Sequence, residues 1–169
     1  MKAAVIGLGK IGLPIAVTIA DAGIEVVGGD ASKRVVDDVN NGREPFPGEP
    51  GLIEGIVRSL DSGLLSATTS NSEASSGADV IVVIVPMYVD ESGVPDYSIL
   101  ESASRDIGTV LAPGQTVIYE TTLPVGATRS RLAPVLEESS GLTAGEDFHV
   151  VHSPERVFSG RIFEDLRSY

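Results

Sequence analysis

The sequence predicts an α/β fold in which a doubly wound, mainly parallel sheet carries helices on both faces. Three observations predict it. Apolar segments of strand length alternate along the chain with segments whose apolar residues recur at helical spacing. The segment Val80–Val85 is apolar at every position, which is typical of a strand covered on both faces. Polar or glycine-rich stretches follow the strands, at the edge where such sheets bind ligands.

Taken in order, the apolar segments predict strands at 3–6, 24–28, 64–68, 80–85, 115–119 and 148–151. Helical spacing and turn residues predict helices at 15–20, 32–40, 51–62, 72–76, 98–111, 127–138 and 162–169. Asp96 is expected to cap the helix that starts at Ser98. Residues 43–50 and 88–97 are expected to be loops, and residues 139–147 a polar, flexible connection.

The first strand runs directly into a glycine turn, Gly7-x-Gly9-x-x-Gly12, and then into a helix. This strand–turn–helix order is the one that a dinucleotide site needs, and it predicts a Rossmann-like domain. The first glycine allows the tight turn, the second lets the backbone approach a pyrophosphate, and the third lets the helix pack closely on the strand. The phosphates would bind to the unpaired N–H groups at the helix N-terminus.

Asp30 ends the second strand, about 20 residues after the turn, where an acidic side chain accepts hydrogen bonds from the ribose hydroxyls. An acid at this position also disfavours NADP, because its 2′-phosphate would meet a like charge. The alternative interpretation is a glycine-rich turn in another α/β protein, with Asp30 as a helix cap.

The length and composition of the chain exclude several classes of function. The chain has 169 residues, enough for one domain, and no apolar run approaches the ~18–20 residues that span a bilayer. With no signal-peptide pattern, a cytoplasmic protein is expected. The chain has no cysteine, and His149 and His152 belong to no ligand cluster, so no metal is expected. The net charge of −12 argues against nucleic acid and anionic membranes as partners.

Six segments, in order, resemble the N-terminal domain of the UDP-glucose/GDP-mannose dehydrogenase family. They are Gly7–Pro14, Asn40-Asn41-Gly42, Glu49-Pro50-Gly51-Leu52, Val85-Pro86, Glu120–Gly126 and Ser153-Pro154-Glu155-Arg156-Val157. The resemblance covers essentially the whole chain, 1–169, as one NAD-binding domain. The family's central helix and its sugar-nucleotide-binding C-terminal domain would lie outside it.

The resemblance implies a four-electron oxidation, in which the C6 alcohol of a UDP-sugar becomes a carboxylate while two NAD are reduced, for polysaccharide biosynthesis. In the family a cysteine holds the aldehyde as a thiohemiacetal, which is oxidised to a thioester and then hydrolysed. That cysteine would lie beyond this chain. We therefore expect an isolated cofactor domain that is inactive alone, from a full-length homodimer built around the central helix.

The resemblance also implies site residues. Those that would bind the cofactor are Gly7, Gly9, Lys10, Ile11, Gly12, Asp30, Arg34 and Thr122. Arg34 or Lys33 would replace a basic family residue whose position is Val35 here, although both are also ordinary solvated helix charges. Met87 stands where the family commonly has a threonine that contacts the cofactor.

Two further residues would be catalytic. Thr122 would orient water or the C6 oxygen, and Glu155 would act as the base for thioester hydrolysis, directly or through a water. The alternatives are a threonine that caps the next helix and a glutamate in the first turn of a helix. Glu155, Arg156 and Val157 would bind the substrate, and their sequence favours an N-acetylhexosamine over UDP-glucose. The neighbouring Glu120 is assigned no role.

Two other functions stay open at this stage. One is the cofactor domain of a β-hydroxyacid-type dehydrogenase, which shares the glycine turn but does not explain Glu120–Gly126 or Ser153–Val157. The other is a stand-alone NAD-binding module without catalysis. A downstream cysteine in a glycine-rich context of the same reading frame would favour the nucleotide-sugar dehydrogenase.

Overall fold

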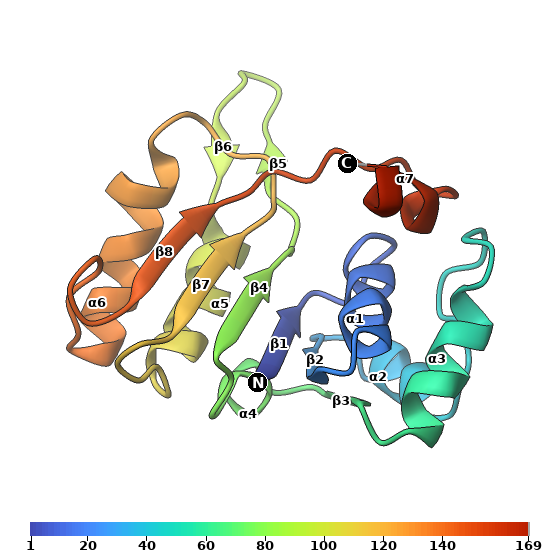
Figure 1. Cartoon of the computed structure of the whole chain (residues 1–169). Coiled ribbons are helices and arrows are strands. Elements are labelled where there is room, and N and C mark those ends of the chain that lie inside the picture. Colours follow the sequence, from blue (N-terminus) through green and yellow to red (C-terminus); the bar gives the residue numbers. More distant parts are fainter. Residues whose placement is uncertain (169) are drawn as a thin grey trace.

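The computed structural model describes residues 1–168 and contains a six-stranded sheet, with the strands in the order β3-β2-β1-β4-β7-β8 (Figure 1). Every neighbouring pair of strands is parallel, which confirms the predicted parallel sheet. The strand order reverses between β1 and β4, and ligands bind at such a reversal in open α/β sheets. The strands are β1 Lys2–Ile6, β2 Glu25–Gly29, β3 Leu65–Thr68, β4 Val80–Val83, β7 Thr116–Tyr119 and β8 His149–His152.

Helices cover both faces of the sheet, because alternate residues of each strand point to opposite sides. In β1, Ala3 and Val5 join an apolar cluster with α1, α2 and α3, while Ala4 and Ile6 join one with α4, α5 and α6. The helices are α1 Gly12–Asp21, α2 Lys33–Asn40, α3 Leu52–Asp61, α4 Asn71–Ser75, α5 Ser98–Gly108, α6 Ala133–Ser140 and α7 Ile162–Ser168. The expected last residue of the final helix, Tyr169, lies outside the described residues.

Strand β4 ends at Val83, two residues earlier than predicted. Ile84 still donates its N–H to the carbonyl of Ile6 at 2.8 Å. The carbonyl of Val85 instead accepts a hydrogen bond from the Thr121 hydroxyl at 2.6 Å, and Pro86 has no N–H to donate. The chain therefore leaves the sheet at this point, and residues 84–86 face the open edge.

The predicted loop at 88–97 contains a short antiparallel hairpin, β5 Tyr88–Val89 with β6 Pro95–Asp96. Asp90 builds its turn, because Oδ1 accepts from the N–H groups of Ser92 and Val94, each at 2.8 Å. The sequence contains this turn chemistry, but two residues a strand are too few to give a periodic apolar signal.

The predicted helix at 127–138 is divided in two. A wide turn of π-helix, η1 Thr128–Leu132, precedes α6, which continues to Ser140. Pro134 explains the division, because it has no N–H to donate to the carbonyl of Ser130 as a regular α-helix would require. Residues 141–147, which were predicted to be a flexible connection, instead form defined turns. In one of them Thr143 N–H donates to Asp147 Oδ2 at 2.8 Å.

Helix α7 is held over α1 by a buried carboxylate from a distant loop. Glu49, only 9% exposed, accepts hydrogen bonds from the N–H of Gly160 at 2.9 Å and of Phe163 at 3.2 Å. These contacts tie the Glu49-Pro50-Gly51 segment to the start of α7 (Figure 1). One carboxylate thus fixes the path of the chain after β8.

Gly12 lets α1 start in contact with the glycine turn. A Cβ added at Gly12 would lie 1.9 Å from the carbonyl oxygen of Gly7 and 2.6 Å from Cγ2 of Ile84. Any side chain here would therefore push α1 off the sheet. Gly9 is the opposite case, because a Cβ there would meet nothing within 4 Å.

Within residues 1–168, every helix is too short or too polar to span a membrane. No three His, Cys, Asp or Glu side chains of this part of the chain are grouped so that they could hold a metal ion.

Gly12→Ala should destabilise the fold, because its methyl group overlaps the Gly7 carbonyl. We expect a loss of at least about 1–3 kcal/mol in the free energy of unfolding, as for other overpacked sites. Urea denaturation followed by circular dichroism would measure it, with Gly9→Ala as the matched control. Equal midpoints for the two variants would contradict this view of α1 packing.

Candidate functional site

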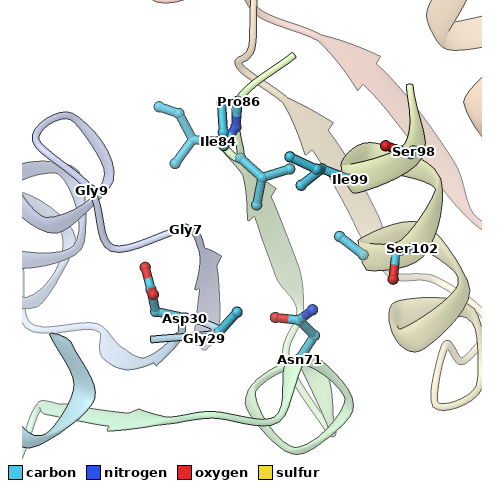
Figure 2. Close-up of a pocket in the computed structure, with 13 residues that line it drawn as sticks. Gly7, Gly9, Gly29, Asp30, Asn71, Ile84, Pro86, Ser98, Ile99 and Ser102 are labelled. Carbon is cyan, nitrogen blue, oxygen red and sulfur yellow. The ribbon is translucent and has the colours of Figure 1, made fainter. Parts of the chain in front are cut away.

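A cavity of about 440 Å³ opens at the carboxyl ends of β1, β2 and β4, at the reversal of strand order. Figure 2 shows the glycine turn and Asp30 on one side of it and residues of α5 on the other. The floor is formed by Asn71 of α4, and Ile84 and Pro86 line the side below the hairpin. The segments that the sequence places after three different strands thus meet around one space.

The glycine turn forms one wall of this cavity through Gly7 and Gly9. Gly7 has a φ of +99°, a conformation that favours glycine, and a Cβ there would crowd the Ile84 carbonyl at 3.1 Å. Gly9 leaves its backbone open to the cavity. Leu13 N–H makes the first bond of the helix, to the Gly9 carbonyl at 3.2 Å, so the earlier N–H groups have no intrahelical acceptor.

Asp30 lies beside the turn and is fixed by two backbone hydrogen bonds. Leu8 N–H donates to Oδ2 at 2.9 Å, and Ser32 N–H donates to Oδ1 at 2.8 Å. The carboxylate therefore connects the glycine turn to the end of β2, and it lines the cavity. Each of its oxygens keeps lone pairs for a ligand hydroxyl. This is the arrangement expected of an acid that accepts from a ribose.

The other sequence-predicted cofactor residues do not belong to the lining of the cavity. Lys10 is exposed and Ile11, partly buried, precedes α1. Arg34 lies on α2, where it donates to Asp38 Oδ2 at 3.1 Å, and its guanidinium lies 5.5 Å from the Phe46 ring centre. Arg34 is thus engaged with the 43–50 loop, and its role towards a cofactor stays a prediction.

The far wall of the cavity was not predicted from the sequence. Asn71, Ser98 and Ser102 supply polar atoms there, from helices that follow β3 and the hairpin. Asn71 Nδ2 donates to Asp106 Oδ2 at 3.0 Å, which fixes the amide. Ser98 N–H donates to Asp96 Oδ1 at 2.8 Å, and this bond lowers the pKa of Asp96. The N-cap residue of α5 is Tyr97, one position after the predicted cap Asp96. The position of these residues, just after strands, was the available signal.

A second, smaller cavity of about 160 Å³ contains the Ser-Pro-Glu-Arg-Val segment. Glu155, Arg156 and Val157 line it together with Glu120, which follows β7 directly. The apolar walls come from Ile15 of α1 and Leu166 of α7. The structure thus brings the three predicted substrate residues together and adds a carboxyl group that the sequence analysis set aside.

The surroundings of this cavity shift the pKa of Glu120. Burial raises the pKa of Glu120, and the charge of Glu155 raises it further. Oε2 of Glu155 is buried and has no hydrogen-bond partner among residues 1–168. A buried carboxylate oxygen without a donor is uncommon, because desolvation is then uncompensated.

Thr122 is exposed on the loop after β7 and lies outside the linings of both cavities as residues 1–168 form them. Its neighbour Thr121 makes the contact that joins β4 and β7, through the carbonyl of Val85. Met87 packs against the apolar cluster below α5. A role for Thr122 therefore stays a prediction, whereas Thr121 has a defined structural one.

The residues around the larger cavity fit a nicotinamide dinucleotide. An open backbone at Gly9, the free N–H groups at the start of α1 and the fixed carboxylate of Asp30 are the features that a pyrophosphate and a ribose require. The cavity volume and its mixture of apolar and hydroxyl side chains suit an adenosine group.

Comparison with known proteins agrees with this fit. The model of the UDP-glucose/GDP-mannose dehydrogenase family, NAD binding domain, matches residues 1–169. The chain is 40% identical over 168 residues to the UDP-N-acetyl-D-mannosamine dehydrogenase of Pyrococcus horikoshii, covering 98% of this chain and 39% of that protein. It is 38% identical over 164 residues to the UDP-N-acetyl-D-glucosamine 6-dehydrogenase of Pseudomonas aeruginosa, covering 95% and 36%.

A solved structure of a protein from the same family is also similar to this chain. A ternary complex of GDP-mannose dehydrogenase from Pseudomonas aeruginosa superposes with a TM-score of 0.93 at 30% identity, over 98% of this chain and 38% of that one. The chain therefore spans about two fifths of the length of these relatives. The comparison covers the cofactor-binding part and leaves the rest of the relatives unmatched.

The chain should bind NAD in preference to NADP, because Asp30 accepts from ribose hydroxyls and repels a phosphate. Asp30→Asn keeps one acceptor oxygen and removes the charge, so NAD should bind about 10-fold more weakly or worse and the preference should narrow. Titration calorimetry would measure both. Glu25→Gln, at the other end of the same strand, is the control. Equal or tighter binding of NADP by the wild type would refute the assignment.

Proposed function

This chain belongs to the UDP-glucose/GDP-mannose dehydrogenase family, and from that membership we propose that it is the NAD-binding part of a nucleotide-sugar 6-dehydrogenase. The full-length protein would oxidise the C6 alcohol of a UDP-sugar to a carboxylate with two NAD, and would be a homodimer. The substrate class we favour is a UDP-N-acetylhexosamine.

One observation carries the proposal: the substrate segment is anchored to the same strand edge as the cofactor loop. Ser153 N–H donates to the Tyr119 carbonyl at 3.0 Å, and Glu155 N–H donates to the Glu120 carbonyl at 3.2 Å. Glu120 N–H in turn donates to the carbonyl of Val83 at the end of β4, at 3.0 Å. A sugar held by residues 153–157 would therefore lie at the edge of the sheet that also binds the cofactor.

We assign tasks in the proposed reaction to the glycine turn, Asp30 and Glu155. The turn Gly7–Gly12 binds the pyrophosphate and Asp30 the ribose, which orients the cofactor along the strand ends. NAD, when bound, supplies the two-electron acceptor. Glu155, as a carboxylate, accepts the proton of the water that attacks the acyl carbon while the acyl–sulfur bond breaks and the sulfur leaves as thiolate. That sulfur would come from a cysteine outside this chain.

The preference for an N-acetylhexosamine rests on the Ser153–Val157 segment and on the relatives. Proteins named UDP-N-acetyl-D-mannosamine dehydrogenase and UDP-N-acetyl-D-glucosamine 6-dehydrogenase align with 98% and 95% of this chain. Arg156 and Val157 are the residues that we assign to the sugar, because both line the cavity of Glu155. A GDP-mannose 6-dehydrogenase of Pseudomonas syringae is also 35% identical, so the panel below includes that nucleotide.

The full-length enzyme should release two NADH for each sugar consumed, whereas the chain 1–169 alone should release none, since it has no cysteine to hold the aldehyde. Absorbance at the NADH band would be followed with UDP-N-acetylmannosamine, UDP-N-acetylglucosamine, UDP-glucose and GDP-mannose. We expect the highest kcat/KM with a UDP-N-acetylhexosamine. Steady turnover by the chain alone, or no turnover by the full-length protein with any of the four, would refute the proposal.

Glu155→Gln in the full-length enzyme keeps the shape and removes the base, so steady turnover should fall by about 10²–10⁴-fold. The first oxidation should survive, which predicts a burst of one or two NADH per site followed by a stall with acylated enzyme. Rapid-mixing absorbance and intact mass would detect both. Glu138→Gln, at an exposed position of α6, serves as the control. Loss of the burst itself would move Glu155 to the first oxidation or to binding.

A further inference from the structure

The cavity that Glu155 lines contains a second carboxyl group, that of Glu120, and the backbones of the two residues are hydrogen-bonded to each other. Glu120 is the first residue after β7, and its carbonyl accepts the hydrogen bond of Glu155 N–H at 3.2 Å. Both side chains line the same space of about 160 Å³. Because Ile118 lines the groove beside α1 and alternate strand residues point to the same side, Glu120, two residues later, points there too. The two residues thus form a pair fixed by the sheet.

The side chain of Glu120 has largely apolar surroundings. Glu120 also lines an apolar groove between α1 and the sheet, formed by Ile15, Ile19 and Ile118 among others. This burial, together with the charge of Glu155, raises the pKa of Glu120. A carboxyl group with a raised pKa keeps its proton to a higher pH, and a protonated carboxyl is a hydrogen-bond donor.

Glu155 is the group that needs such a donor. Its Oε2 is buried and has no partner among the described residues 1–168. The titratable and charged residues of the surrounding elements are Asp21 at the end of α1, His152 at the end of β8, Arg156 in the lining, and Glu164, Asp165 and Arg167 on α7. Asp165 is already paired with Arg161 at 2.7 Å. The wall that α1 and α7 present to the cavity is apolar, through Ile15 and Leu166.

We propose that Glu120 is a positioning residue for Glu155: its protonated carboxyl donates a hydrogen bond to the buried Oε2 and so leaves Oε1 to meet the ligand. With this proton in place the pair carries one negative charge and not two. The two carboxyl groups then share one proton, as neighbouring carboxyl groups do in other coupled sites. The catalytic consequence rests on the function proposed above, whereas the hydrogen bond itself does not.

The hydrogen bond can be tested on the chain itself by following the side-chain carboxyl ¹³C shifts of both glutamates against pH. Glu120 should titrate above the ordinary glutamate value of about 4.3. In Glu155→Gln its midpoint should move down, since the neighbouring charge is gone. Glu146→Gln, in the exposed turn after α6, should leave it unchanged. An identical Glu120 midpoint in the wild type and in Glu155→Gln would overturn the proposal.

The positioning role is tested in the full-length enzyme by comparing two variants. Glu120→Gln retains a donor and should keep kcat within about 3-fold, whereas Glu120→Ala should lower kcat by about 10–100-fold with little change in KM. The wild type should lose activity as rising pH ionises Glu120, and Glu120→Gln should not, since an amide does not titrate. Equal losses in both variants, or superimposable pH profiles, would assign Glu120 a structural role only.

The two experiments distinguish a wrong proposed function from a wrong role for Glu120. If the full-length wild type reduces no NAD with any nucleotide sugar, the proposed function is wrong, and the carboxyl titration still decides whether the pair exists. If the enzyme is active and the titration shows no coupling, the dehydrogenase assignment stands and the role of Glu120 falls.

Discussion

The contact between Gly12 and the carbonyl of Gly7 is the constraint on which the arrangement of this domain depends. A Cβ at Gly12 would lie 1.9 Å from that oxygen, so the absence of a side chain sets how closely α1 approaches β1. The close approach places the first N–H groups of α1 at the end of β1 and opens the backbone at Gly9 to the cavity. It also lets Leu8 N–H reach Asp30, which joins the phosphate and ribose positions into one rigid unit.

The second half of the site is assembled by backbone and hydroxyl hydrogen bonds between strand ends. Thr121 bonds to Val85, Glu120 to Val83, and Glu155 to Glu120. Because each bond links a residue after one strand to its neighbour in the sheet, the loops after β4, β7 and β8 form a continuous row. The acid pair Glu120 and Glu155 lies in this row, where burial and the charge of Glu155 raise the pKa of Glu120.

The segment Glu49-Pro50-Gly51 has a structural role, because Glu49 holds the backbone at the start of α7. Glu49 is nearly buried and uses both carboxylate oxygens to hold the backbone of Gly160 and Phe163. Through α7 it closes the apolar side of the small cavity, since Leu166 belongs to that helix. A residue distant from either cavity therefore determines the shape of one of them, which is why a motif can mark a site without touching a ligand.

The sequence by itself determined the elements and the cofactor turn, because these depend on local patterns. Apolar runs predicted all the strands of the main sheet to within a few residues, and the order of strand, glycine turn, helix, strand and acid predicted the roles of Gly7, Gly9, Gly12 and Asp30. Only the tertiary structure decided which side chains share a cavity. Asn71, Ser98 and Ser102 became cavity residues, and Glu120 became the neighbour of Glu155. Such pairings join segments far apart in the chain, and they are set by strand order and helix approach, which no local pattern encodes.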